Sequence, residues 1–178
     1  MVTLLALTLL GAVAQDNANP QFTALQDFQR RVSDYVNLER SLAKGIAMNK
    51  PTDEPHVILE RQHELARKIR EARSKAQQGE IFTSAISKEF RRLLGLAMAG
   101  GNNVGIKKSL ARSEPVRLAL HVNETYPADV PLQSMPPTIL INLPRLPPGL
   151  EYRIDGHALV LRDTGANVVV DLIPDAIP

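Results

Sequence analysis

The chain of 178 residues contains no cysteine and no tryptophan, and only 4% of its residues are aromatic. Without cysteine the protein cannot form disulfides, thiolate metal sites or a cysteine nucleophile, so its stability must come from packing. The shortage of aromatic rings weighs against the base stacking by which many proteins bind single-stranded nucleic acid. We therefore expect no nucleic-acid partner.

Recognisable catalytic motifs are also missing. No Gly-x-Ser-x-Gly nucleophile elbow occurs. The glycine-rich loop at 100–109 fails as a P-loop, because Ile106 stands where the lysine belongs and a helix precedes it. The sequence also shows no pair of carboxylates whose environments would shift their pKa values apart, as an acid–base catalytic pair requires. These absences predict a non-enzymatic protein without a cofactor, and leave open a hydrolase whose residues are dispersed in the sequence.

Segment 1–14 has the features of a signal peptide. Leu4–Val13 is apolar, and Ala12-Val13-Ala14 is a small-x-small cleavage site before Gln15. The apolar run is too short to anchor the chain across a bilayer. We therefore expect cleavage near Ala14, a periplasmic or secreted protein, and no stable membrane span in the mature chain. No Lys or Arg precedes the apolar run, which leaves open a start further upstream, and a buried N-terminal helix is the alternative.

The part from 15 to 113 is predicted to be helical. Apolar residues recur at three- and four-residue spacings over 21–48, over about 52–78, and from a cap near 83 to the glycines at 100. The short connection between the first two helices favours an antiparallel helical hairpin.

The part from 114 to 178 has a different composition, since ten of the chain's 13 prolines lie at or beyond Pro115 and exclude a long helix there. Asp155-Gly156 is a strong hairpin signal, and a second turn near Thr164-Gly165 extends it to a three-stranded meander. Val116–Val122 alternates in polarity and could add a fourth strand, whereas 138–143 reads as one helical turn or an extended run.

Folding about these turns predicts the register. It sets Ile154 opposite His157, Tyr152 opposite Leu159 and Leu150 opposite Leu161, then Leu161 opposite Val168 and Leu159 opposite Val170. Directly opposed residues share a face, so one face of the sheet is apolar and needs a cover. We therefore predict an α+β fold in one domain: an antiparallel helical hairpin plus a third helix, packed on a small antiparallel sheet of three to four strands.

The net charge of +2 conceals an asymmetry. Residues 21–113 carry 17 Lys and Arg against 10 Asp and Glu, whereas residues 114–178 carry 4 against 8. The charges alternate in sign along the helices, which favours solvated helix faces and attraction between the two halves. A basic surface for a polyanion is the alternative.

Three polar residues of the second helix are candidate metal ligands. His56, Glu60 and His63 lie within about 60° on one helix face. Two turns separate the histidines, so another ligand would be needed, and neither His-x-x-x-His nor His-Glu-x-x-His occurs. An exposed polar face is the alternative.

Three further patterns lie in the C-terminal part. Arg153 and Asp171 are expected in one row across the outer face of the sheet, where they could form an ion pair. His157 is expected to be a packed edge histidine. Asn123-Glu124-Thr125 fits a glycosylation sequon.

The C-terminal part also carries a resemblance. The run LPRLPPGLEYRIDG at 143–156, the later LVLRD and VVVDL segments and the preceding 116–127 run are similar to a group of uncharacterised exported bacterial proteins. That group pairs a helical N-terminal part with a β-meander tail, and it implies no activity. More loosely, 146–161 resembles the tail of small periplasmic proteins of nickel and cobalt homeostasis, which implies a metal-related role without a ligand set.

These features together predict a non-enzymatic exported protein of the bacterial envelope that acts through protein–protein interaction, with another envelope protein or with itself. A periplasmic metal-binding protein that uses His56, Glu60 and His63 is the alternative. The dispersed hydrolase is a second alternative.

Overall fold

The computed structural model of the protein describes residues 19–46, 51–99, 119–127 and 135–177. The elements are α1 (Pro20–Ala43), α2 (Pro55–Ala72), α3 (Ser84–Ala99), α5 (Pro137–Leu140), β1 (Leu150–Asp155), β2 (Ala158–Asp163) and β3 (Val168–Ile173). The strands form one antiparallel sheet in the order β1-β2-β3, so the predicted α+β fold is confirmed. The predicted signal peptide, the glycine-rich loop at 100–109 and the start of the predicted fourth strand lie outside the described residues.

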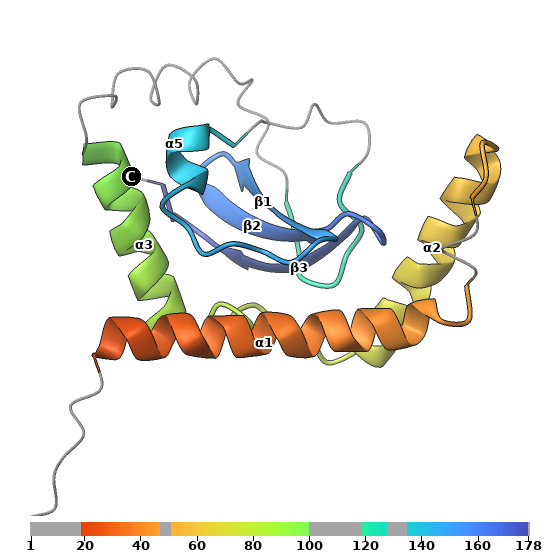
Figure 1. The fold of residues 1–178 in the computed structure, drawn as a ribbon, viewed down its shortest axis with the longest axis horizontal. Helices are drawn as coiled ribbons and strands as arrows, with labels where there is room; N and C mark the ends of the chain where they lie inside the picture. Colours follow the sequence, from red (N-terminus) through yellow and green to blue (C-terminus); the bar gives the residue numbers. More distant parts are fainter. Residues whose placement is uncertain (1–18, 47–50, 100–118, 128–134, 178) are drawn as a thin grey trace, which may run out of the picture.

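Three of the helices lie around the sheet. In Figure 1, α1 runs beneath the sheet, α3 rises at one end of it and α2 at the other. The two long helices contact each other, and they meet at a steep angle instead of lying side by side. Among the described residues, no helix is both long and apolar enough to cross a membrane.

The helix boundaries follow local chemistry. Asn19 accepts a hydrogen bond from the Gln21 amide (3.0 Å) and Pro20 stands in the first turn, which together start α1. α2 ends at Ala72, earlier than predicted, and the side-chain amide of Asn123 satisfies the carbonyls of Arg70 and Arg73 (3.1 and 3.0 Å) that this end leaves free.

An aromatic cluster joins the helices to the sheet. The ring of Phe28 on α1 lies 4.8 Å from that of Phe90 on α3 and 5.6 Å from that of Phe82, measured between centroids. Tyr152 of β1 meets Phe90 edge-on at 6.0 Å. The apolar face of the sheet is thereby covered, as its alternating pattern requires.

The first hairpin differs from the predicted register by two residues. Ile154 pairs with Leu159 and Tyr152 with Leu161, so the turn residues are Gly156-His157 instead of Asp155-Gly156. Gly156 supplies a positive φ of 55°, which a residue with a side chain adopts less readily. Because side chains alternate with a period of two, this shift keeps the same residues on the apolar face.

The second hairpin contains a β-bulge that the sequence did not predict. Leu161 pairs with Asp171 and Arg162 with Val169, so Val170 is an extra residue on β3. The bulge turns both Val170 and Asp171 toward the helices. The predicted ion pair between Arg153 and Asp171 on the outer face is therefore wrong.

The far edge of β3 is covered by residues 123–126. Thr125 bridges to Val168, the Asn123 amide donates to the Val169 carbonyl (2.8 Å), and the Val169 amide donates to the Glu124 carbonyl (2.8 Å). The described part of the predicted fourth strand, 119–122, forms no strand, and the contact with the sheet comes from the residues after it. The turn predicted within 138–143 is present as α5.

Candidate functional site

The predicted metal ligands lie exposed on α2. His56 Nε2 is 3.3 Å from a carboxylate oxygen of Glu54, and the side chains of Glu60 and His63 also face solvent. Within the described ranges, no group of three or more His, Cys, Asp or Glu side chains could hold a metal ion. The additional ligand that the two-turn separation demands is therefore not supplied by any described element.

The candidate sequon has a structural role instead. Asn123 is half-buried, and its side-chain nitrogen donates to the carbonyls of Arg70 and Arg73. Its positive φ of 70° suits asparagine better than most residues. An amide nitrogen that is held in this way is not presented for glycosylation.

His157 lies at the hairpin turn, as predicted for an edge histidine, although it is exposed. Its Nδ1 lies 2.9 Å from the carbonyl of Ile177, and its own carbonyl accepts from the amides of Ala176 and Ile177 (2.8 and 3.0 Å). These bonds fasten the C-terminal segment to the turn.

Asp171 is fully buried and holds the connection between α2 and α3. Its carboxylate accepts hydrogen bonds from the backbone amides of Gly79 (3.0 Å), Ile81 (2.8 Å) and Phe82 (2.7 Å). Buried charges persist where hydrogen bonds satisfy them. The sequence indicates this role only in part. A single carboxylate within the apolar run 168–173 needs a hydrogen-bond partner, but the sequence does not identify that partner.

Asp163 forms a second buried link between sheet and helix. It accepts a hydrogen bond from the hydroxyl of Tyr35 on α1 (2.7 Å) and another from the amide of Ala166 (2.8 Å). Burial raises the pKa of Asp163, and the two hydrogen bonds oppose that rise. Burial and the charge of Asp163 also raise the pKa of Tyr35, so its hydroxyl stays protonated and donates.

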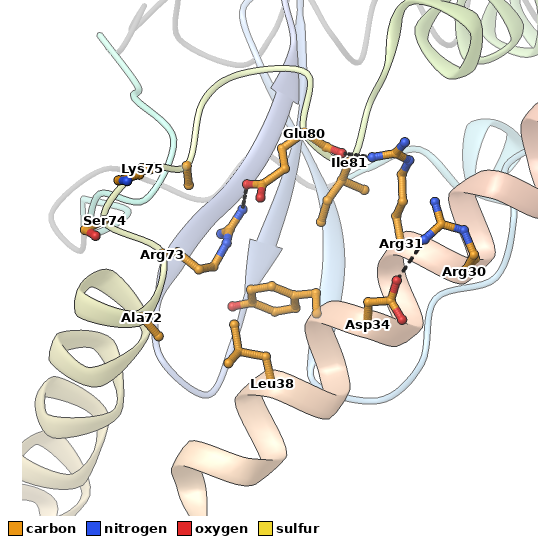
Figure 2. Close-up of a pocket in the computed structure, with 12 residues that line it drawn as sticks. Arg30, Arg31, Asp34, Leu38, Ala72, Arg73, Ser74, Lys75, Glu80 and Ile81 are labelled. Atoms are coloured by element: carbon orange, nitrogen blue, oxygen red, sulfur yellow. Dashed lines mark hydrogen bonds and ion pairs between the residues drawn. The ribbon is translucent and has the colours of Figure 1, made fainter.

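A cavity of about 440 Å³ lies between α1 and the connection that follows α2 (Figure 2). Its polar lining contains four cationic and two acidic side chains. These are Arg30, Arg31, Arg73, Lys75, Asp34 and Glu80.

Arg73 forms the inner wall of this cavity (Figure 2). Its side chain is only 7% exposed, and its guanidinium carbon lies 5.1 Å from the centre of the Tyr35 ring. Nη2 donates to a carboxylate oxygen of Glu80 (2.9 Å) and to the carbonyl of Val170 (3.1 Å). Nη1 is buried and has no hydrogen-bond partner in the described part of the protein.

The outer wall of the cavity is formed by α1 and the rim residues. Arg30 binds Asp27 (2.6 Å) and Asp34 (3.0 Å), and Arg31 binds Asp27 (2.9 Å) and donates to the backbone carbonyl of Glu80 (2.6 Å). Lys75 is exposed at the rim and forms no ion pair with another described residue. The four cationic side chains therefore face three carboxylates, those of Asp27, Asp34 and Glu80, which leaves one positive charge in excess.

A second recess, of about 460 Å³, lies beside β1. It is lined by four consecutive strand residues together with apolar residues from α5 and the following loop. These are Leu150–Arg153, Met135, Leu140, Pro144, Arg145 and Leu146. Alternate strand residues point to opposite faces of the sheet, so a recess that touches four in a row lies along the strand's edge.

The described residues offer Tyr152 and Ile154 of β1 no backbone partner at this edge. The Thr164 amide donates to the Gly149 carbonyl (2.9 Å), so these two residues form a hydrogen-bonded pair. Hydrogen-bonded and non-hydrogen-bonded pairs alternate along an antiparallel ladder, and this bond therefore shows which residues of β1 bind β2. Glu151 and Arg153 consequently direct their backbone groups toward β2, whereas Tyr152 and Ile154 direct theirs away from the sheet. In the described ranges, no strand pairs with this outer edge.

The side chains beside this edge are charged on the outer face. Glu151 binds Arg153 (2.7 Å) and Arg162 (2.5 Å). Burial alone would raise the pKa of Glu151, but the two arginines outweigh it and lower that pKa. Arg145 is exposed in the recess and makes no hydrogen bond or ion pair with another described residue.

Comparison of the chain with known proteins finds no matching family model, no matching curated protein and no matching solved structure. The chemistry of the two recesses must therefore indicate the function. Among the described residues that line the two recesses there is no histidine, and the Tyr35 hydroxyl beside the cavity is a hydrogen-bond donor with a raised pKa.

Proposed function

We propose that the protein is a non-enzymatic envelope protein that self-associates through the outer edge of β1. The observation that carries this proposal is the row of backbone groups at Tyr152 and Ile154 that have no partner among the described residues, with a recess beside it that apolar and charged side chains line. Such an edge pairs readily with another strand. The signal-like segment 1–14 supports the envelope location, and so does the resemblance to exported bacterial proteins that we infer from the tail motifs alone.

The occupant that best fits this edge is β1 of a second copy. Antiparallel pairing about a two-fold axis through Tyr152 would let the two Tyr152 residues exchange backbone hydrogen bonds. Ile154 of each copy would donate to Leu150 of the other, whose own amide is already bound to the Pro147 carbonyl. Four intermolecular backbone hydrogen bonds would result.

The charges on the outer face favour this register. Glu151 of each copy would lie opposite Arg153 of the other in the closely spaced, non-hydrogen-bonded positions of the ladder. An axis through residue 151 would instead oppose two glutamates, and an axis through residue 153 would oppose two arginines. Like charges directly opposite are destabilising, so the strand selects the pairing centred on Tyr152.

The apolar residues beside the recess supply further association energy. Leu140 is 43% exposed and the adjacent Ile141 is 80% exposed. Burial of one such side chain contributes about 1.5–3 kcal/mol. A partner strand that lies in the recess would cover part of this surface.

Light scattering and sedimentation over a range of concentrations test the proposal. We expect the native chain from residue 15 to dimerise and expect salt to weaken the dimer, because ion pairs that solvent partly reaches are screened. Arg153→Glu and Glu151→Arg should each abolish self-association, since each opposes like charges. Mixed together, the two variants should form a heterodimer, because every opposed pair is then complementary.

Arg145→Glu is the matched control, since it makes the same charge change in the recess without altering the paired row, and it should still dimerise. Thermal melts of each variant establish that the monomer is folded. A native protein that stays monomeric at millimolar concentration would overturn the proposal, and so would a dimer that both single variants retain.

A further inference from the structure

The positive charge of Arg73 is buried and incompletely satisfied. Its side chain is 7% exposed, yet Nη1 has no hydrogen-bond partner in the described residues. A buried donor without a partner destabilises the fold. The ring of Tyr35 stacks against the guanidinium and offsets part of this cost, although a ring face is a weaker partner than an anion.

Among the described residues, Glu80 is the carboxylate that forms an ion pair with Arg73, and its side chain is exposed. Glu80 is 52% exposed, and its Oε2 lies 2.9 Å from Nη2 of Arg73. The backbone on both sides of Glu80 is fixed, because the amides of Gly79 and Ile81 bind Asp171. The Glu80 side chain can therefore swing into solvent while the connection keeps its place.

Further positive side chains line the same cavity. Arg30 and Arg31 come from α1, and Lys75 comes from the connection after α2, where it lies on the opposite side from the two arginines (Figure 2). A single carboxylate would only repeat the contact that Glu80 already makes. A dianion with several oxygens would match a fork of arginine donors and the surplus of positive charge.

We propose that this cavity binds a small oxyanion of the phosphate class, which displaces the Glu80 carboxylate from Arg73. The cavity lies between α1 and the α2–α3 connection, away from the β1 edge, so this binding is independent of self-association. In the unliganded protein, Glu80 occupies the place of the ligand.

Titration calorimetry and thermal melts with inorganic phosphate and with glycerol 3-phosphate test this, with sodium chloride holding the ionic strength constant. Saturable binding and a higher melting temperature are expected, because a ligand of the folded state stabilises it. Tighter binding of glycerol 3-phosphate would identify an esterified phosphate as the ligand, and tighter binding of phosphate would identify the free ion. Both results support the site.

Variants separate a specific site from general attraction to a basic surface. Glu80→Gln should raise the affinity up to about fivefold, because it removes an exposed competing ion pair. Lys75→Ala should lower the affinity by a similar factor, whereas Lys88→Ala, at an exposed lysine of α3, should leave it unchanged. Arg73→Met, which keeps the packing against Tyr35, should abolish binding if its melt shows a folded protein.

Two results would overturn the inference. One is a native protein whose melting temperature responds to phosphate no more than to chloride. The other is phosphate binding that weakens equally in Lys75→Ala and Lys88→Ala and is unchanged in Glu80→Gln. Since Lys75, Lys88 and Glu80 are exposed, these readouts hold even if Arg73→Met fails to fold.

Discussion

The two edges of the sheet differ in how their polar groups are satisfied. At the β3 edge, residues 123–126 pair with the strand, Asp171 binds three backbone amides, and Arg73 donates to the Val170 carbonyl. At the β1 edge, the backbone groups of Tyr152 and Ile154 have no partner strand among the described residues.

This difference suggests that the β3 edge stabilises the fold and that the β1 edge is available for binding. Polar groups that are buried and paired destabilise the fold strongly when a partner is removed, because they cannot return to water. Polar groups at an open edge can bind water instead, so their loss costs the fold little while their presence attracts another strand. Changes at the β3 side should therefore alter folding, and changes at the β1 side should alter association.

The largest effect is expected for Asp171→Ala. The change removes the acceptor of the Gly79, Ile81 and Phe82 amides, and each buried amide without a partner costs about 1–3 kcal/mol. The free energy of unfolding should fall by at least about 4 kcal/mol, a large share of a typical total. Urea denaturation followed by circular dichroism measures it. Asp34→Ala on the exposed side of α1 is the control and should change it by less than about 0.5 kcal/mol.

The next effect is expected for Tyr35→Phe. It leaves an oxygen of Asp163 buried without the hydroxyl that binds it, at about 2 kcal/mol near neutral pH. Burial already raises the pKa of Asp163, and the Tyr35 bond opposes that rise, so the variant should raise it further. A folded-state pKa above the unfolded value means that stability is present at low pH and is lost as the pH rises through the folded pKa.

The gap in unfolding free energy between native protein and Tyr35→Phe should consequently shrink as the pH falls toward about 4, the ordinary pKa of aspartate. Urea melts at several pH values measure this gap. A gap that stays constant with pH would show that Asp163 is not the group left without its partner.

These contacts also mark what the sequence could predict. The alternation in 150–161 placed the correct residues on the apolar face, because an error of two residues in register preserves the face. The register itself depends on which two residues form the turn, and Gly156 allows more than one choice. The bulge at Val170 moves Asp171 from the predicted outer face of the sheet to the face that the helices cover, and no local sequence pattern predicts the bulge.

The candidate cavity was less predictable than the fold. Arg73, Glu80 and Tyr35 come from three separate segments, and Asp171 holds the loop from about ninety residues away. Local periodicity finds helices and strands but does not say which buried charge meets which backbone. The net positive charge of residues 21–113 was the available signal, and it did not locate the four cationic groups that meet at the cavity.

A smaller effect is expected for Asn123→Ala, at the β3 edge that residues 123–126 cover. The variant loses two hydrogen bonds to the last carbonyls of α2 and places alanine at a φ of 70°. Together these should reduce the free energy of unfolding by about 1–2 kcal/mol. Asn123→Gly separates the two causes, since glycine adopts the φ freely and loses only the hydrogen bonds. If both variants have the same free energy of unfolding as the native protein in urea melts, the contact of Asn123 with α2 does not stabilise the β3 edge.

The smallest effect on folding is expected for Ile141→Ser, beside the open edge. Ile141 is 80% exposed, so its replacement should change the free energy of unfolding by less than about 0.5 kcal/mol. The same change should weaken the proposed dimer measurably in sedimentation, because Ile141 follows Leu140 at the recess beside β1. Ile58→Ser is the matched control and should affect neither quantity, since Ile58 is 52% exposed on α2, and α2 and α5 lie at opposite ends of the sheet (Figure 1). If Ile141→Ser lowered stability and left association intact, the open edge would resemble the closed one, and the division between a folding side and a binding side would not hold.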